Sequence, residues 1–184
     1  MPDQDRLPPI PEAQQSAEQR AVSAELTAGP RGRLVGPFVP LMRSPELMRR
    51  VQKVGEFLRF ESSLPENVKE LAILVVARLW GQGFEWSFHL PLALKAGVAR
   101  EACEAIAEGR PPSGLSSIER AAWDFLTELN AGKAVADETW RRAELAFGEQ
   151  GVIELIGVNG YYALLAMVMN AARTPSPEAE IPLK

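Results

Sequence analysis

The segment LPENVKELAILVVARLWGQGFEWSFHLPLALKAGV, residues 64–98, decides the fold of this 184-residue chain. The apolar residues of its first half share one helical face: Val68, Leu71, Ala72, Val75 and Leu79. The glycines at 81 and 83 end this helix, and a second apolar helix then runs to about Gly97. So short a break turns the second helix back along the first, so we expect an antiparallel helix pair.

The rest of the chain also shows helical patterns with recognisable ends. The predicted helix starts are marked by capping residues: Ser16 with Gln19, Ser44 with Pro45, Ser116 with Glu119, and Asp137. Residues 29–40 hold three glycines and three prolines and predict an irregular connection that packs on the domain. Strand signals are nearly absent. The sequence therefore predicts an all-α, single-domain helical bundle of about seven or eight helices.

Composition excludes several classes of function. The net charge is −4 and no Lys/Arg block occurs, so we expect no nucleic-acid partner. The single cysteine, Cys103, can form neither an internal disulfide nor a CxxC redox pair. The N-terminal segment lacks the apolar stretch of a signal peptide. We therefore expect a cytoplasmic protein.

The apolar run at 152–172 approaches the length of a membrane-spanning helix. It is interrupted by polar or small residues: Glu154, Asn159, Gly160 and Asn170. Because polar groups inside a membrane are costly, we interpret the run as a helix buried in the core or at a subunit interface, with no membrane partner. Outside the domain at 16–174, we expect a flexible arm at 1–15 and a flexible tail at 175–184.

The only histidine, His89, has two carboxylates within geometric reach. Glu85 precedes it by one helical turn, and Glu70 lies about one turn (roughly 5 Å) from its height on the preceding helix of the pair. Periodicity does not settle whether Glu70 faces His89, a second neighbour or solvent. The helix N-terminus should lower the pKa of Glu85, and a nearby carboxylate should favour a protonated His89. Such a group can move protons near neutral pH.

Structural interpretations remain open beside this one. Glu85 and His89 can be a satisfied polar pair, and Tyr161 and Tyr162 fit a core or interface although one hydroxyl could reach a ligand. The four tryptophans are expected in packing, and Cys103 as an inert apolar group. A metal site of Glu70, Glu85 and His89 matches no strong signature, so we expect none.

Residues 64–98, with the upstream GPFVPLMRSPEL, resemble the carboxymuconolactone decarboxylase family of the alkylhydroperoxidase D-like superfamily. In the peroxidase branch the pattern is a Glu, a CxxC twelve residues later, and a His four residues after the second Cys. Here that frame reads Glu70, Gln82, Glu85 and His89. Both thiols are missing, so dithiol peroxidase or disulfide reductase activity lacks its reacting groups.

The resemblance then implies the decarboxylase side of the family, which works without metal or organic cofactor. It implies an alkylhydroperoxidase D-like fold, a homo-oligomer (dimer, trimer or hexamer) and a role in aromatic compound catabolism. The expected catalytic residues are His89 as proton donor with Glu70 and Glu85, and the expected substrate-binding residues are Gln82 and Trp86. Residues 81–90 contain no arginine for a substrate carboxylate, so Arg33, Arg43 or Arg78 would have to reach in.

The first hypothesis is therefore a cofactor-independent acid–base lyase of decarboxylase type, acting on a small carboxylated lactone or related enolisable carboxylate. A lactone hydrolase or isomerase using the same pocket is the alternative enzyme. The alternative from another class is a non-enzymatic, oligomeric helical binding protein.

Overall fold

The computed structural model describes residues 4–184, so the first three residues of the expected arm lie outside the described part. Its elements are η1 (Glu12–Gln14), α1 (Ala17–Ala28), α2 (Phe38–Leu41), α3 (Pro45–Phe60), α4 (Glu66–Leu79), α5 (Gly83–Lys95), α6 (Arg100–Ala107), α7 (Ser117–Gly132) and α8 (Asp137–Ala172). No strand occurs among residues 4–184. The all-α prediction is confirmed, with eight α-helices in the described chain.

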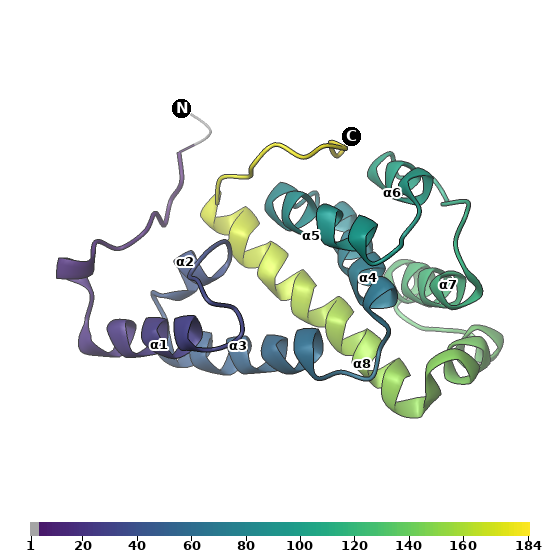
Figure 1. The fold of residues 1–184 in the computed structure, drawn as a ribbon, viewed down its shortest axis with the longest axis horizontal. Helices are drawn as coiled ribbons and strands as arrows, with labels where there is room; N and C mark the ends of the chain where they lie inside the picture. Colours follow the sequence, from purple (N-terminus) through teal and green to yellow (C-terminus); the bar gives the residue numbers. More distant parts are fainter. Residues whose placement is uncertain (1–3) are drawn as a thin grey trace.

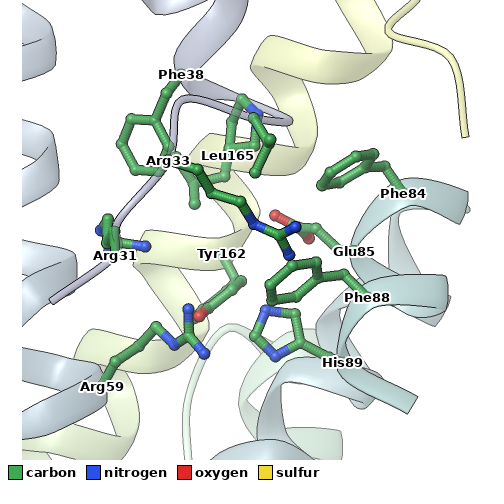
Figure 2. A pocket seen from close by; sticks show the side chains of 12 residues that line it. Arg31, Arg33, Phe38, Arg59, Phe84, Glu85, Phe88, His89, Tyr162 and Leu165 are labelled. Carbon is green, nitrogen blue, oxygen red and sulfur yellow. The ribbon is translucent and has the colours of Figure 1, made fainter. Parts of the chain in front are cut away.

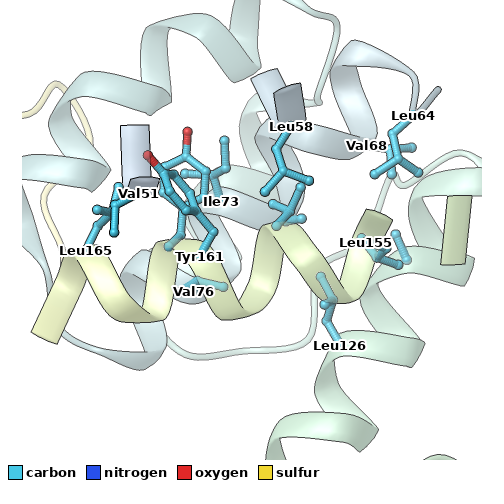
Figure 3. Packing of buried hydrophobic residues seen from close by; sticks show 14 of the residues in the cluster. Val51, Leu58, Leu64, Val68, Ile73, Val76, Leu126, Leu155, Tyr161 and Leu165 are labelled. Atoms are coloured by element: carbon cyan, nitrogen blue, oxygen red, sulfur yellow. The ribbon is translucent and has the colours of Figure 1, made fainter. Parts of the chain in front are cut away.

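Helices α4 and α8 form the centre of the bundle (Figure 1). Helix α4 packs against α5, α6, α7 and α8, while α8 also contacts α2, α3 and α7. Leu155, Tyr161 and Leu165 of α8 meet Leu58 of α3 and Ile73 of α4 in the larger of two apolar clusters (Figure 3). The smaller cluster joins α4, α5, α6 and the C-terminal tail.

Most predicted helix ends are confirmed, with three differences. The capping boxes of Ser16 and Ser116 are both present. The side chain of Ser44 makes no capping hydrogen bond, although Pro45 begins α3 as expected. Asp137 is the first helical residue of α8 and not its cap. The connection at 29–40 also contains the start of the short helix α2.

Helix α8 joins two helices that the sequence separates at Gly148. That residue has φ 68° and ψ 170°, which is not helical, so the chain kinks there and continues in a new direction. By length and composition α8 could cross a membrane, as buried helices of soluble proteins also could. Half of its most apolar window is buried within the protein.

Both ends of the described chain make specific contacts. The N–H of Arg6 donates to the carbonyl of Ala172 at 2.8 Å. In the C-terminal tail, Ile181 is buried and its carbonyl accepts the indole N–H of Trp86 at 2.5 Å. The expected mobility of the two ends stays a prediction, but movement of the tail would leave the Trp86 N–H without its acceptor.

Truncation after residue 178 should therefore lower the free energy of unfolding. An unsatisfied buried donor costs about 1–3 kcal/mol, and the loss of buried Ile181 adds to it. Urea unfolding of the full-length and truncated chains measures the loss. The truncation should cost less in a Trp86→Phe background, which has no N–H to satisfy; an equal cost in both backgrounds would show that this bond contributes nothing.

Candidate active site

A cavity of about 60 Å³ lies where the 31–37 connection meets α2, α3, α5 and α8 (Figure 2). Its lining combines aromatic and aliphatic walls with five side chains that carry a guanidinium, a carboxyl or an imidazole group. Those five are Arg31, Arg33, Arg59, Glu85 and His89. Convergence of charged groups in an apolar concavity is the usual signature of a ligand site.

The α4–α5 pair brings Glu70 and His89 together as the sequence predicts. Oε2 of Glu70 lies 2.7 Å from Nδ1 of His89, and both side chains are buried. Glu70 is not part of the cavity lining, whereas His89 is. Because Glu70 engages Nδ1, the other ring nitrogen, Nε2, is the one that a ligand can reach.

The protonation state of His89 differs from the expectation. Burial lowers the pKa of His89 below its ordinary 6.5, and this outweighs the raising effect of Glu70. The positive charges of Arg59 and Arg31 lower it further. The prediction of an imidazolium is therefore wrong, and the ring is neutral at neutral pH. The free energy lost when the charged ring leaves water exceeds the free energy gained from the Glu70 carboxylate.

The pKa of Glu85 is shifted in the direction opposite to the expected one. Burial raises the pKa of the Glu85 carboxyl well above 4.5, although it lies in the first turn of α5. Neither of its oxygens has a hydrogen-bond partner in the described chain, and no hydrogen bond joins it to His89. The helix N-terminus stabilises a charge by only about 0.3–1 kcal/mol, which is less than the free energy that the charged carboxylate loses when it is fully removed from water. Glu85 is thus an unpartnered carboxylic acid facing the cavity.

Three guanidinium groups border the same cavity. Arg33 and Arg59 lie over the ring of Phe88, with 5.6 and 5.8 Å from each guanidinium carbon to the ring centroid. Arg31 lies 4.8 Å from the ring centroid of Phe38. None of the three arginines forms an ion pair within residues 4–184. Unpaired arginines beside a neutral acid and a neutral imidazole leave the cavity strongly cationic, which suits an anionic ligand.

The sequence identified only one of these arginines. Arg33 was a candidate, and it lines the cavity. Arg43 instead donates to the main-chain carbonyls of Leu7, Pro8 and Val39, and Arg78 packs against Gly109. Arg31 and Arg59 were missed. The only available signal was that Arg31 stands two residues before Arg33 in the same irregular segment, whereas nothing in the α3 pattern marks Arg59.

Gln82 and Trp86, the expected substrate-binding residues, contact other parts of the protein. Gln82 caps α5 by accepting the N–H of Phe84 at 2.6 Å and donates to Asn170 at 2.8 Å. Trp86 is 1% exposed and packs in the smaller apolar cluster. Neither lines the cavity. Gln82 precedes the helix and Trp86 lies on the face of α5 that meets the C-terminal tail, so both side chains serve folding.

Tyr162 is a site residue that the sequence left undecided. Its ring lines the cavity and meets the His89 imidazole edge-on, with 5.1 Å between ring centroids. Cys103 is fully buried in the smaller cluster, where burial raises its pKa to about 11. No group of three metal-ligating side chains is found among residues 4–184.

Comparison with known proteins gives one family match and several structural ones. A model of the Carboxymuconolactone decarboxylase family matches residues 45–128, which include Glu70, Glu85 and His89. No curated protein sequence matches the chain.

Two solved structures share the fold. One is the alkylhydroperoxidase AhpD core of an uncharacterized peroxidase-related protein from Ralstonia eutropha (TM-score 0.75, 15% identity, 95% of this chain and 94% of that chain). The other is a protein of unknown function from Agrobacterium tumefaciens, a suggested antioxidant defence protein AhpD (TM-score 0.65, 16% identity, 75% of this chain and 95% of that chain). At such low sequence identities, these similarities demonstrate a shared fold alone.

The buried acid predicts a specific pH dependence of stability. Glu85 binds a proton more tightly in the folded than in the unfolded chain, so its contribution is full below pH 4.5 and is lost as pH rises toward its folded pKa. Replacement by the neutral isostere, Glu85→Gln, should remove this loss. The difference in unfolding free energy between the variant and the wild type should grow from pH 4 to pH 8 in urea titrations. A difference that does not change with pH would contradict the raised pKa.

The single histidine makes the second electrostatic prediction directly measurable. The His89 ring should titrate below pH 6.5 in an NMR titration of its Cε1–H signal. Glu70→Gln should move that midpoint lower still, because Glu70 is the group that raises it. Glu66→Gln, which alters an exposed carboxylate on the same helix, serves as the control. A midpoint above 6.5 in the wild type would show that the Glu70 contact outweighs burial.

Proposed function

We propose that this chain, which a model of the Carboxymuconolactone decarboxylase family matches over residues 45–128 and which shares its fold with AhpD-like structures, is a cofactor-independent acid–base lyase of decarboxylase type. Its substrate is a small carboxylated lactone or a related enolisable carboxylate. The observation that carries the proposal is the cavity that joins an unpartnered carboxylic acid, a neutral imidazole and three arginines without ion pairs.

The first step is binding of the substrate carboxylates by guanidinium groups. Arginine presents paired N–H donors that match a carboxylate, and the walls formed by Phe84, Phe88 and Leu165 exclude water around it. Loss of CO₂ breaks the carbon–carboxylate bond and leaves the electron pair on an enolate-like or dienolate-like oxygen. Fixed positive charge near that oxygen stabilises the transition state.

The second step is protonation of the remaining carbanion. The sequence assigned this role to His89, but a neutral ring whose Nδ1 is held by Glu70 has no proton to give from Nε2. Glu85 does have one, because burial keeps its carboxyl protonated. In the proposed mechanism Glu85 donates the proton to the carbanion and is left ionised. Water supplies one proton per turnover, which His89, oriented by Glu70, accepts at Nε2 and passes on to restore the Glu85 carboxylic acid.

A lactone hydrolase using the same cavity is the second candidate, and the lowered His89 pKa favours it. A neutral imidazole with a free Nε2 can take a proton from water, which then attacks the lactone carbonyl. The two reactions differ in product, since only the lyase releases CO₂.

Thiol peroxidase chemistry lacks its reacting groups in this chain. The printed descriptions of the structural neighbours mention peroxidase or antioxidant roles. The CxxC positions here are Gln82 and Glu85, and the buried Cys103 lies outside the cavity lining with its pKa raised to about 11. A thiolate nucleophile is therefore not available at the site.

Self-association and a cytoplasmic location are also proposals. Four apolar side chains of α3 are exposed in the isolated chain, which supports self-association: Leu47, Val54, Phe57 and Phe60. The reduced single cysteine is compatible with a reducing compartment.

Turnover of a panel of carboxylated lactones, followed by CO₂ release and by ring opening, tests the proposal. Glu85→Gln and His89→Gln should each lower kcat by about 10²- to 10⁴-fold while circular dichroism stays unchanged. Arg59→Gln should mainly raise KM, because it removes ground-state and transition-state binding alike.

Cys103→Ala is the matched control and should leave turnover unchanged. Ring opening without CO₂ release would favour the hydrolase. Binding of the lactones without any turnover would favour the non-enzymatic helical binding protein.

A further inference from the structure

We propose that Tyr161 is a positioning residue that holds the Arg31 guanidinium at the cavity, in a space that Gly55 leaves open. The three residues come from three separate elements: Arg31 from the connection between α1 and α2, Gly55 from α3, and Tyr161 from α8. The inference rests on the proposed role of Arg31 in binding an anionic substrate.

Arg31 needs a tertiary contact to have a defined position. It stands in an irregular segment after Gly29-Pro30 and before Gly32, whose φ is 70°, so no helix or sheet ladder fixes its backbone. Nη2 of Arg31 donates to the Tyr161 hydroxyl oxygen at 3.2 Å, and the two residues are 130 positions apart in the sequence. On its other side the guanidinium lies over the Phe38 ring at 4.8 Å from the centroid. Arg33, by contrast, is exposed and makes no hydrogen bond through its side chain in the described chain.

The hydrogen-bond partner of Arg31, the Tyr161 hydroxyl, does not neutralise the guanidinium charge. A carboxylate in the place of Tyr161 would form an ion pair and compete with an anionic ligand for the guanidinium. The Tyr161 hydroxyl is buried, which raises its pKa to about 12 and keeps it neutral. A neutral oxygen can therefore orient Arg31 while its full positive charge remains available to the cavity.

Gly55 provides the room for this contact. A Cβ at this position would lie 2.0 Å from the Tyr161 hydroxyl oxygen and 2.3 Å from the Arg31 NH2 nitrogen. Any side chain at position 55 must therefore displace one of the two groups. Glycine in the middle of a helix is otherwise unfavourable, and the close approach of Tyr161 and Arg31 accounts for its presence in α3.

Malonate binding measured by isothermal titration calorimetry at low ionic strength tests the inference, with the neutral malonamide as ligand control. Arg31→Gln should weaken malonate binding, and Tyr161→Phe should weaken it about five- to ten-fold, because the guanidinium loses the contact that orients it. Gly55→Ala should act in the same direction. Gly160→Ala, at an exposed α8 position with no neighbour within 4 Å of the added Cβ, is the matched glycine control and should bind as the wild type does.

The decisive comparison is the combination of Tyr161→Phe with Arg31→Gln. If Tyr161 acts through Arg31, the double variant should bind malonate no more weakly than Arg31→Gln alone. Additive weakening would show that the Tyr161 hydroxyl has only a general structural role and would overturn the inference. Wild-type affinity in Tyr161→Phe would overturn it as well, even if Gly55→Ala fails to fold.

The inference and the proposed reaction fail in different ways. Wild-type malonate affinity in Arg31→Gln, or no binding by the wild type, would remove the anion site and the inference with it. The expected pattern of affinities in a protein that turns over no carboxylated lactone would support the positioning role of Tyr161 and remove only the lyase reaction.

Discussion

The contact between Glu70 and His89 across the α4–α5 turn is the interaction on which the site depends. It connects α4 and α5, which the break at Gly81 and Gly83 turns into an antiparallel pair. It also orients the single imidazole through its Nδ1 atom. Buried pairs of this kind contribute little net stability, because both groups must leave water. This pair instead fixes the orientation of the ring. Glu70 engages Nδ1, so Nε2 is the nitrogen left for a ligand in the cavity that His89 lines. The cavity on that side receives its other walls from α2, α3 and α8.

Desolvation decides the electrostatics of this cavity. Glu70 raises the pKa of His89 as expected, but both His89 and Glu85 are almost completely removed from water, and burial has the larger effect on each. Burial raises the pKa of Glu85 and lowers the pKa of His89, which is the reverse of the two shifts that local sequence rules predict. The arginines then carry the charge of the site. In the proposed reaction this division separates anion binding by the arginines from proton transfer by Glu85 and His89.

The frame of Glu70, Gln82, Glu85 and His89 also shows how one architecture can serve different chemistry. Where the peroxidase branch has two thiols, this chain has a residue that caps α5 and an acid that faces the cavity. The helical scaffold and the Glu–His contact do not depend on the thiols. The residues at these two positions remove the thiols that redox chemistry needs and leave groups suited to the proposed acid–base chemistry, while the fold remains that of the AhpD-like structures.

The sequence by itself determined the helices and the α4–α5 turn, because these follow from periodicity and helix-stop residues. It placed Glu70 within about one turn of the height of His89, but packing decided that the Glu70 side chain faces the imidazole. It did not reveal Arg31 or Arg59 as residues of the cavity, and it proposed Gln82 and Trp86 as substrate-binding residues although neither lines the cavity. Those outcomes depend on which face of α5 meets the 31–37 connection and which meets the C-terminal tail, and both segments arrive from distant parts of the chain. The protonation states of Glu85 and His89 were likewise decided by the tertiary structure alone, since burial is a property of the packed protein and not of a residue's neighbours in sequence.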